Sequence, residues 1–422
     1  MKFKKNLRVW LYSFALFLYR QTLEGLSKFH PKAKLWVQGQ EDVWQQLEKV
    51  FTVQERKVVW FHTASLGEFE QGRPVMEAYR LEYPEHFILV TFFSPSGYQV
   101  RKNFAGVDFV SYLPFDGAKS SQRFLDLVKP QLAIFVKYEF WHFYLTGLAQ
   151  RQVPTLLVSA IFRPKQVFFA WYGGFYRNLL RQFSRIFVQD QASKDLLEGI
   201  QIQSVQVAGD TRFDRVYAQS RQVNSWDLLT EFLQGEAFAV LGSVWQADMD
   251  RIIPLINKQT LPIKWVIVPH EIKEEELAKW EKEILLACIY SHSEKSTPLA
   301  NAQVLLVNEM GRLSSLYQGA SFAFIGGAFG AGLHNTLEAA VFGPAIAFGN
   351  LNYLKFREAC ALIEEGIARV ISSSADLEKC WVDLWNNPLR REKIKTKSQA
   401  YIANNMGATE AIMHHVRTIQ YA

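Results

Sequence analysis

The chain has 422 residues, of which 49% are apolar and 21% are charged, and it contains three cysteines. This composition excludes a largely disordered chain, a collagen and a coiled coil, and the length predicts two or three domains. The cysteines lie far apart and form no C-x-x-C pair. A zinc ribbon, a redox dithiol and a disulfide framework are therefore not expected.

The net charge of +6 is concentrated at the N-terminus. Residues 1–40 carry eight basic side chains and one acidic side chain, whereas the rest of the chain carries 39 basic and 40 acidic ones. Because the body is neutral, its charge does not predict binding to nucleic acid. The basic excess needs a local explanation.

An aromatic-rich apolar run spans residues 9–19, between Arg8 and Arg20. As a helix it would reach about 16 Å, roughly half of the ~30 Å hydrocarbon core of a bilayer. Its basic flanks predict that residues 1–35 lie on the anionic, cytoplasmic face of a membrane. Two alternatives are a buried first helix with solvated ends and a signal peptide, for which no A-x-A-like site follows. A second aromatic stretch, 168–176, suits either a lipid surface or a core.

Beyond this segment, short β-branched or aromatic runs alternate with helical patterns. Such alternation predicts parallel βαβ units, and two series of strands predict an α/β protein with two Rossmann-like domains facing a cleft. We expect one domain at 36–218 and another at 236–422, with the last helix free to cross back to the first. The predicted strands are 57–61, 87–92, 132–136, 155–158 and 185–188, then 238–241, 265–268, 304–306, 322–325 and 345–347.

The first motif that follows a strand is Ser65-Leu66-Gly67-Glu68. Ligands of doubly wound sheets bind beyond the carboxyl ends of the strands, so Glu68 is a candidate general base. A helix N-terminus would favour its charged form by about 0.3–1 kcal/mol. The alternative is that Ser65 and Glu68 only form a capping box.

Two further charged residues follow strands of the first domain. Glu139 comes soon after the buried run 132–136 and can bind substrate hydroxyls or orient a cation; the alternative is a surface ion pair with Lys137. Arg212 lies near the domain break and suits bidentate binding of a carboxylate or phosphate. Its alternative is a simple pair with Asp214.

A glycine-rich loop, residues 326–332, follows a predicted strand and precedes a predicted helix. Its main-chain amides can cradle a phosphate, although it lacks both the Walker lysine and the dinucleotide spacing. Glu338, one turn into the helix, can then bind the hydroxyls of a ribose. The alternative is a cap-like pair between Asn335 and Glu338.

Two more strand ends, Pro269-His270 and Met310-Gly311-Arg312, belong to the same half of the chain. Main-chain donors and acceptors in these turns can read the edge of a base. The spacing of His, Asp and Glu residues predicts no metal site, and no cofactor is expected.

The order of these motifs resembles the bacterial 3-deoxy-D-manno-octulosonic acid (Kdo) transferases of lipopolysaccharide synthesis. The resemblance covers nearly the whole chain, including the basic hydrophobic N-terminus. The motifs that carry it are Ser65-Leu66-Gly67-Glu68, Glu139-Phe140-Trp141, Gly209-Asp210-Thr211-Arg212-Phe213-Asp214, Met310-Gly311, Gly326-Gly327 and His334-Asn335-Thr336-Leu337-Glu338.

The resemblance implies a B-type glycosyltransferase fold, CMP-Kdo as donor, a lipid A precursor as acceptor, no metal and a place on the cytoplasmic side of the inner membrane. It assigns the role of base to Glu68 and transition-state stabilisation to Glu139 and Arg212. The residues that it places around the donor are Pro269, His270, Met310, Gly311, Arg312, Gly326, Gly327, Asn335, Thr336, Leu337 and Glu338.

Several positions depart from the family pattern. His270 and Arg312 stand where the family has Arg and Glu, Thr336 stands where it has Pro, and Arg212 stands where it has Lys. Arg212 keeps its charge, so its implied role is retained, whereas His270 and Arg312 change the side chains around the nucleotide. Two alternatives stay open: a B-type glycosyltransferase that uses a UDP-sugar, and a non-catalytic nucleotide-binding membrane protein of the same fold.

Overall fold

The computed structural model describes residues 2–222, 226–290, 299–330 and 332–419, with only the backbone described for 2–6 and 300. Two compact units divide the chain: Met1–Asp214 with Met406–Ala422, and Arg215–Asn405. The division falls inside helix α9 (Thr211–Ser220), close to the predicted break between residues 218 and 236. Helix α10 (Asp227–Leu233), which lies in that predicted break, belongs to the second unit, and the last helix α18 (Ala408–Thr418) belongs to the first.

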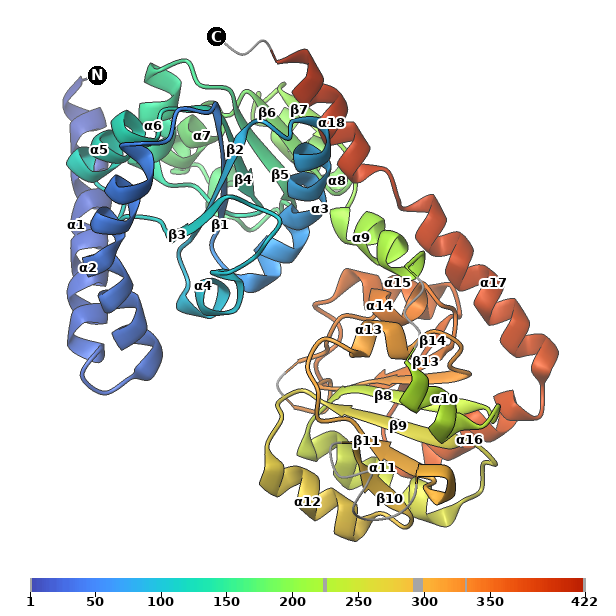
Figure 1. The fold of residues 1–422 in the computed structure, drawn as a ribbon. Coiled ribbons are helices and arrows are strands. Elements are labelled where there is room, and N and C mark those ends of the chain that lie inside the picture. Colours follow the sequence, from blue (N-terminus) through green and yellow to red (C-terminus); the bar gives the residue numbers. More distant parts are fainter. Residues whose placement is uncertain (1, 223–225, 291–298, 331, 420–422) are drawn as a thin grey trace. The chain divides into compact units, whose positions relative to one another are not determined.

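The first unit contains one parallel sheet of seven strands in the order β3-β2-β1-β4-β5-β6-β7 (Figure 1). All five predicted strands of this half are present, and the short strands β3 and β7 were missed. The strands are β1 (Val58–Thr63), β2 (Phe87–Phe92), β3 (Phe109–Tyr112), β4 (Pro130–Val136), β5 (Thr155–Ala160), β6 (Arg185–Val188) and β7 (Val205–Val207).

The second unit also contains a seven-stranded parallel sheet, in the order β10-β11-β9-β8-β12-β13-β14. The five predicted strands are again present, and the missed strands β10 and β14 lie at the two edges. The strands are β8 (Phe238–Val244), β9 (Lys264–Pro269), β10 (Ala287–Ile289), β11 (Val304–Leu306), β12 (Phe322–Ile325), β13 (Ala345–Gly349) and β14 (Ala368–Ile371). Two Rossmann-like sheets confirm the predicted α/β class.

Helices connect the strands in both units. In the first unit they are α1 (Lys2–Leu26), α2 (Pro31–Phe51), α3 (Leu66–Glu82), α4 (Pro95–Arg101), α5 (Ala118–Val128), α6 (His142–Gln150), the 3-10 turn η1 (Val167–Phe169), α7 (Gly174–Leu180) and α8 (Gln191–Glu198). In the second they are α11 (Gln246–Lys258), α12 (Glu274–Glu283), η3 (Leu299–Asn301), α13 (Leu313–Leu316), α14 (Leu337–Ala340), α15 (Arg357–Glu364), α16 (Ser374–Trp385) and α17 (Pro388–Asn404).

The central strands are buried on both faces, as expected for a parallel sheet covered by helices. All six residues of β1 are buried, and alternate side chains enter different cores. Trp60 packs in the core formed with α2, α5 and α6, whereas Val59 and Phe61 pack in the core formed with α3 and α18. The continuous apolar runs therefore predict the strands well, because each strand must satisfy two cores.

Helix α1 docks on the first unit through one residue in particular, Tyr12. The Tyr12 hydroxyl donates to Oδ2 of Asp116 at 2.6 Å, and its ring lies near Phe175. Burial raises the pKa of Asp116 to about 6, while bonds from Tyr12 and from main-chain amides at the start of α6 oppose this rise. One face of helix α1 is therefore packed against the rest of the unit, as the buried-helix alternative predicts, but the other face is not covered.

The opposite face of α1 exposes a stripe of apolar side chains. Trp10, Phe14 and Phe17 are between 45% and 59% exposed, and their spacing places them on one side of the helix. Within the described part of the chain, no helix is both long enough and apolar enough to cross a membrane.

Replacing Tyr12 with Phe should lower the stability of the protein more at about pH 8 than at about pH 5. Removal of a hydrogen bond to a charged group typically costs about 1.5–3 kcal/mol. Because the native pKa of Asp116 is raised to about 6, its carboxylate is ionised at the higher pH and needs this donor, but is protonated at the lower pH. The measurement is the midpoint of urea unfolding at both pH values. Tyr19→Phe, on the same helix, is the control, and an equal loss at both pH values would contradict an ionised acceptor.

Candidate functional site

Glu68 lies at the start of α3, immediately beyond the carboxyl end of β1. Its Oε2 accepts the Ser65 main-chain N–H at 3.0 Å and the Ser65 hydroxyl at 3.3 Å. The capping arrangement that the spacing allows is therefore present. It fixes the carboxylate at the end of the sheet and does not by itself decide whether Glu68 also has a chemical role.

The electrostatic surroundings make Glu68 more basic than an ordinary carboxylate. Burial and then the nearby charge of Glu139 raise the pKa of Glu68 to about 7, against the opposing effects of the Ser65 amide and Lys137. A carboxylate with a pKa near neutrality can accept a proton effectively at physiological pH. Glu68 and Glu139 follow β1 and β4, the neighbouring strands at which the strand order of the first sheet reverses, which is where doubly wound sheets bind ligands.

Glu139 is only 6% exposed. The alternative that it forms an ion pair with Lys137 on the surface is therefore wrong, because Glu139 is buried. Its Oε2 accepts the Trp141 indole N–H at 2.6 Å and lies 2.9 Å from Nε2 of His62. His62 is fully buried at the end of β1 and did not emerge as a candidate from the sequence. The sequence gives little reason to select His62, because it is a single histidine at the end of an apolar strand.

Arg212 is paired, but with Asp210 rather than with Asp214. The Arg212 guanidinium donates to Oδ2 of Asp210 at 2.9 and 2.7 Å, and the Arg212 amide donates to Oδ1. Asp214 instead accepts the main-chain N–H groups of Gly407 and Thr409 at the start of α18. The predicted pair is wrong because Asp214 serves as a helix cap.

The loop of Arg212 is attached to the helix of Glu68. The Thr211 hydroxyl donates to the main-chain oxygen of Gln71, and the Gln71 amide lies 3.5 Å from Asp210. Gln71 is one turn after Glu68 on α3. The three predicted catalytic residues therefore belong to one connected region of the first unit.

In the second unit, three aromatic side chains stack beside the glycine loop. The His270 ring lies 4.5 Å from Trp245 and 4.2 Å from His334, measured between ring centroids. The Trp245 indole N–H donates to Nε2 of His334 at 3.0 Å. Burial, reinforced by His270, lowers the pKa of His334 to about 4, so the ring is neutral at physiological pH. His270, a departure from the family pattern, is thus built into a packed stack.

Several main-chain amides of the glycine loop have partners within the protein. Asp248 is buried, and its Oδ2 accepts the main-chain N–H of Gly327 at 2.9 Å as well as that of Trp245. The amides of Gly330, Gly332 and His334 donate to main-chain oxygens of Gly326 or Gly327, and the Gly326 amide donates to Gly242. These five amides donate to groups within the protein, and residue 331 lies outside the described part of the chain. The role of the loop in phosphate binding stays a prediction.

The segment after the loop forms the cap-like pair that the sequence allowed. The Asn335 side chain accepts the Leu337 amide at 3.1 Å and donates to Oε1 of Glu338 at 3.0 Å. Thr336 and Leu337 are buried, and α14 is only four residues long. The predicted helix start therefore offers little helix dipole, and the carboxylate of Glu338 is the charged group of this segment.

The remaining predicted residues lie at the ends of neighbouring strands. Pro269 is the last residue of β9. Met310 is 74% exposed, Gly311 has a φ of +86° that favours glycine, and Arg312 lies 3.1 Å from Glu309 and packs over Trp226. Met310 and Gly311 are exposed, whereas the main-chain oxygen of Arg312 accepts the amides of Ser315 and Leu316.

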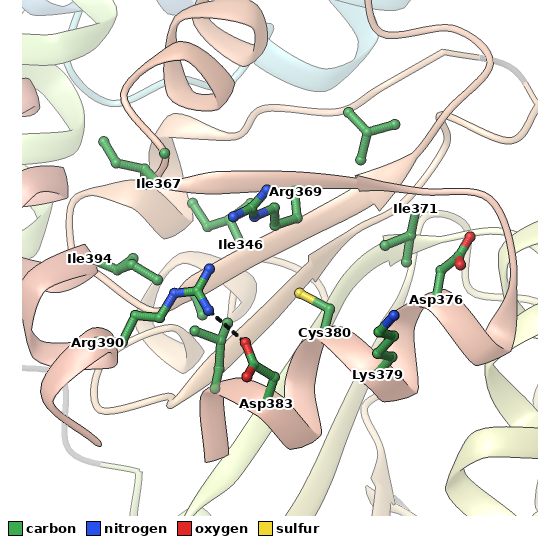
Figure 2. A pocket seen from close by; sticks show the side chains of 14 residues that line it. Ile346, Ile367, Arg369, Ile371, Asp376, Lys379, Cys380, Asp383, Arg390 and Ile394 are labelled. Carbon is green, nitrogen blue, oxygen red and sulfur yellow. Dashed lines mark hydrogen bonds and ion pairs between the residues drawn. The ribbon is translucent and has the colours of Figure 1, made fainter. Parts of the chain in front are cut away.

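A separate cavity of about 600 Å³ lies between β13, β14, α16 and α17 (Figure 2). Ile346, Ile367 and Ile371 form apolar parts of its wall, and Arg390 pairs with Asp383 at its edge. None of the predicted site residues lines it. Across the described ranges, no cluster of three His, Cys, Asp or Glu side chains is arranged to hold a metal ion.

Comparison with known folds shows what the two sheets resemble. The UDP-GlcNAc 2-epimerase from Neisseria meningitidis, solved with UDP-GlcNAc, aligns with a TM-score of 0.60 at 15% identity and covers 86% of this chain and 100% of its own. MurG from Acinetobacter baumannii aligns at 0.54 and 12%, again covering 86% and 100%. These similarities confirm a B-type glycosyltransferase-like fold.

Sequence comparison finds similarity to one family of enzymes. Residues 41–215 match the model described as 3-deoxy-D-manno-octulosonic-acid transferase (kdotransferase). The 3-deoxy-D-manno-octulosonic acid transferase of Rickettsia felis is 26% identical, covering 83% of this chain and 76% of its own length. That of Haemophilus influenzae is also 26% identical, covering 84% and 85%. The chain is therefore similar over most of its length to Kdo transferases, which are glycosyltransferases, and this confirms the resemblance drawn from its motifs.

Proposed function

We propose that this protein transfers Kdo from CMP-Kdo to a lipid A precursor at the cytoplasmic face of the inner membrane, with Glu68 as the general base. The observation that carries the proposal is the carboxylate of Glu68, whose pKa is raised to about 7 at the reversal of strand order in the first sheet. A Kdo transferase needs a base that removes a proton from an acceptor hydroxyl near neutral pH.

In the proposed reaction, Glu68 accepts the proton of an acceptor hydroxyl as its oxygen attacks the anomeric carbon of Kdo. The bond from that carbon to the phosphate breaks, and CMP leaves with the electron pair. Glu139 provides the negative charge that makes Glu68 more basic and favours an oxocarbenium-like transition state. Arg212, held by Asp210, is assigned to the Kdo carboxylate or the leaving phosphate. The proposed step uses no metal, because these side chains supply its charges.

For the donor, we infer contacts that do not use the occupied glycine-loop amides. Glu338 is the candidate for the ribose hydroxyls, and the exposed main chain at 310–311 is the candidate for the cytosine edge. His270 and His334 present neutral, stacked rings rather than the cation usual in the family. The rival is a UDP-sugar donor, and the fold supports it equally, since the epimerase with the same architecture was solved with UDP-GlcNAc.

Replacing Glu68 with Gln should reduce turnover by roughly 100-fold or more, the scale of a lost general base, with CMP binding retained. The wild-type rate should fall as the pH drops below about 7, because protonated Glu68 cannot act as a base. The assay is mass spectrometry of the lipid product formed from CMP-Kdo and a lipid A precursor. Glu77→Gln, which alters an exposed residue of the same helix, is the matched control. Near-normal turnover of Glu68→Gln would leave only the capping role.

Replacing Glu338 with Ala should weaken CMP binding by about 1–3 kcal/mol, the range for hydrogen bonds to a charged group. Calorimetry with CMP and with UDP measures this loss and also tests the donor class. Glu364→Ala, on the exposed surface of the second unit, is the control. Unchanged CMP affinity in a folded variant would reject the role of Glu338, and a preference of the wild-type protein for UDP would favour the rival donor.

The membrane part of the proposal is supported by two exposed aromatic regions of the first unit. One is the stripe on α1 that contains Trp10, Phe14 and Phe17, and the other contains Trp171, which is 91% exposed, and Tyr172. Tyr12, on the covered face of α1, packs against Phe175, which follows Tyr172 by three residues. Exposed aromatic side chains beside basic residues suit the interface of an anionic leaflet.

Replacing the stripe residues Trp10, Phe14 and Phe17 with Ser should reduce binding to anionic vesicles while leaving the helix docked by Tyr12. Point substitutions are preferable to deletion of residues 1–20, because deletion would also remove the Tyr12 donor from buried Asp116. The measurement is co-sedimentation with anionic and with neutral vesicles.

A second variant tests the charge of the same surface. Each basic side chain near an anionic membrane contributes about 1 kcal/mol, so neutralisation to Gln should also reduce the salt sensitivity of binding. The four substituted residues are Lys2, Lys4, Lys5 and Arg8, of which the first three have side chains outside the described part. The control for the stripe variant replaces exposed apolar residues elsewhere on the first unit with Ser, namely Val53, Leu81 and Val100. Unchanged binding of both α1 variants would place the anchor elsewhere, with 168–176 as the next candidate.

A further inference from the structure

A row of buried polar side chains crosses the carboxyl ends of three adjacent strands. Thr91 is near the end of β2, His62 is near the end of β1, and Glu139 follows β4, in the order in which these strands lie in the sheet. Thr91 and His62 are completely buried and Glu139 is 6% exposed. Polar groups in such a position need hydrogen-bond partners, and here they supply partners to one another.

The first part of the row is fixed by Trp60, whose indole N–H can only donate. It donates to Oγ1 of Thr91 at 2.8 Å. The Thr91 hydroxyl proton is then available to Nδ1 of His62, which lies 2.9 Å from Oγ1. This direction leaves Nδ1 as the acceptor and places the imidazole proton on Nε2.

The second part of the row ends at Glu139. His62 Nε2 lies 2.9 Å from Oε2 of Glu139. The Trp141 indole N–H lies 2.6 Å from the same oxygen and 3.0 Å from Nε2 of His62, and the shorter distance assigns its proton to the carboxylate. An unprotonated Nε2 would turn its lone pair toward a carboxylate oxygen, which is repulsive. A proton on Nε2 satisfies both ends, because His62 and Trp141 then both donate to the same carboxylate oxygen.

We propose that Trp60, Thr91 and His62 form a hydrogen-bonded relay that holds Glu139 as an ionised carboxylate beside Glu68, so that His62 is a positioning residue of the transfer reaction. The inference rests on the proposed function only for the consequence in catalysis. The relay itself is a statement about protonation and geometry within the first unit, and it is testable without turnover.

The consequence follows from the charges that face Glu68. From the end of β4 these are Glu139, which raises the pKa of Glu68, and Lys137, which lowers it; from its own helix start, the Ser65 amide also lowers it. Tyr138 lies in the same segment and interacts with Glu68. Of these groups Glu139 contributes the largest effect after burial, so the basicity of Glu68 depends on Glu139 staying ionised.

Loss of the Thr91 hydroxyl should weaken the effect of Glu139 on the basicity of Glu68. In Thr91→Val, Nδ1 of His62 loses its donor and can instead carry a proton directed to the main-chain oxygen of residue 91, which lies 3.2 Å away. If His62 then has a bare Nε2, Glu139 takes up a proton; if His62 becomes cationic, its charge offsets Glu139. Both outcomes make the net charge facing Glu68 less negative, and both lower the pKa of Glu68.

The first test reads the tautomer directly by ¹⁵N NMR of the histidine rings in the full-length protein. The His62 signals are assigned by their loss in His62→Gln. We expect a neutral ring protonated on Nε2 in the wild type, and a change in protonation in Thr91→Val. A wild-type ring protonated on Nδ1, or on both nitrogens at neutral pH, would overturn the proposal.

The second test measures the titration of Glu68 by ¹³C NMR, alongside the pH dependence of Kdo transfer. In Thr91→Val the midpoint should fall by roughly half to one pH unit, the direction expected when a neighbouring negative charge is lost. Turnover at about pH 8 should fall roughly 3- to 10-fold because a weaker base accepts the proton less well. Thr91→Ser retains the hydroxyl and should restore the wild-type midpoint, which a merely structural role would not require.

The outcomes separate the relay from the proposed function. A wild-type midpoint in Thr91→Val, or an equal shift in Thr91→Ser, contradicts the relay. A protein that shows both expected NMR results but transfers no Kdo contradicts the proposed function and supports the relay. If Thr91→Val does not fold, because Trp60 is left without an acceptor, the double variant Trp60→Phe with Thr91→Val removes both polar groups and is measured in its place.

Discussion

The constraint on which the first unit depends is the burial of a carboxylate at the end of a parallel sheet. Glu139 is almost inaccessible to solvent, so its carboxylate needs hydrogen-bond partners, and the rings of Trp141 and His62 both lie within hydrogen-bond distance of its Oε2. Those rings are in turn fixed by the aromatic core, in which Trp60 and Tyr144 pack together. The chemistry of Glu68 therefore depends on the packing beneath the site as well as on the residues that line it.

The second unit also contains a buried carboxylate, but its hydrogen-bond partners are main-chain amides and not side-chain rings. Asp248 is this buried carboxylate, and its Oδ2 accepts two main-chain amides, including one from the glycine loop. Burial raises the pKa of Asp248 while these amides lower it. One amide of the glycine loop is thus bonded to an internal carboxylate. Composition alone could not reveal this, because Asp248 lies far from the loop in the sequence.

The central strands could be predicted from the sequence because each is an apolar run long enough to fill two cores. The four missed strands, β3, β7, β10 and β14, are short and lie at the edges of the two sheets, and Arg369 interrupts the apolar run of β14. Glu68 and Glu139 could be selected because charged residues after buried strands stand out. Their partners could not, since the contact between His62 and Glu139 joins residues 77 positions apart. Asp214 was misassigned for the same reason: its partners, Gly407 and Thr409, lie almost 200 residues away.

The N-terminal helix shows how one residue can connect a surface to the body of the unit. Tyr12 places its hydroxyl on Asp116, and Asp116 also accepts the amides of Phe143 and Tyr144 at the start of α6. Helix α6 follows directly after Trp141, one of the two donors to Glu139. The helix that exposes the apolar stripe is thus bound to the same segment that fixes the buried carboxylate. An apolar stripe anchored in this way has a defined orientation relative to Glu68, which a flexible N-terminal tail would lack.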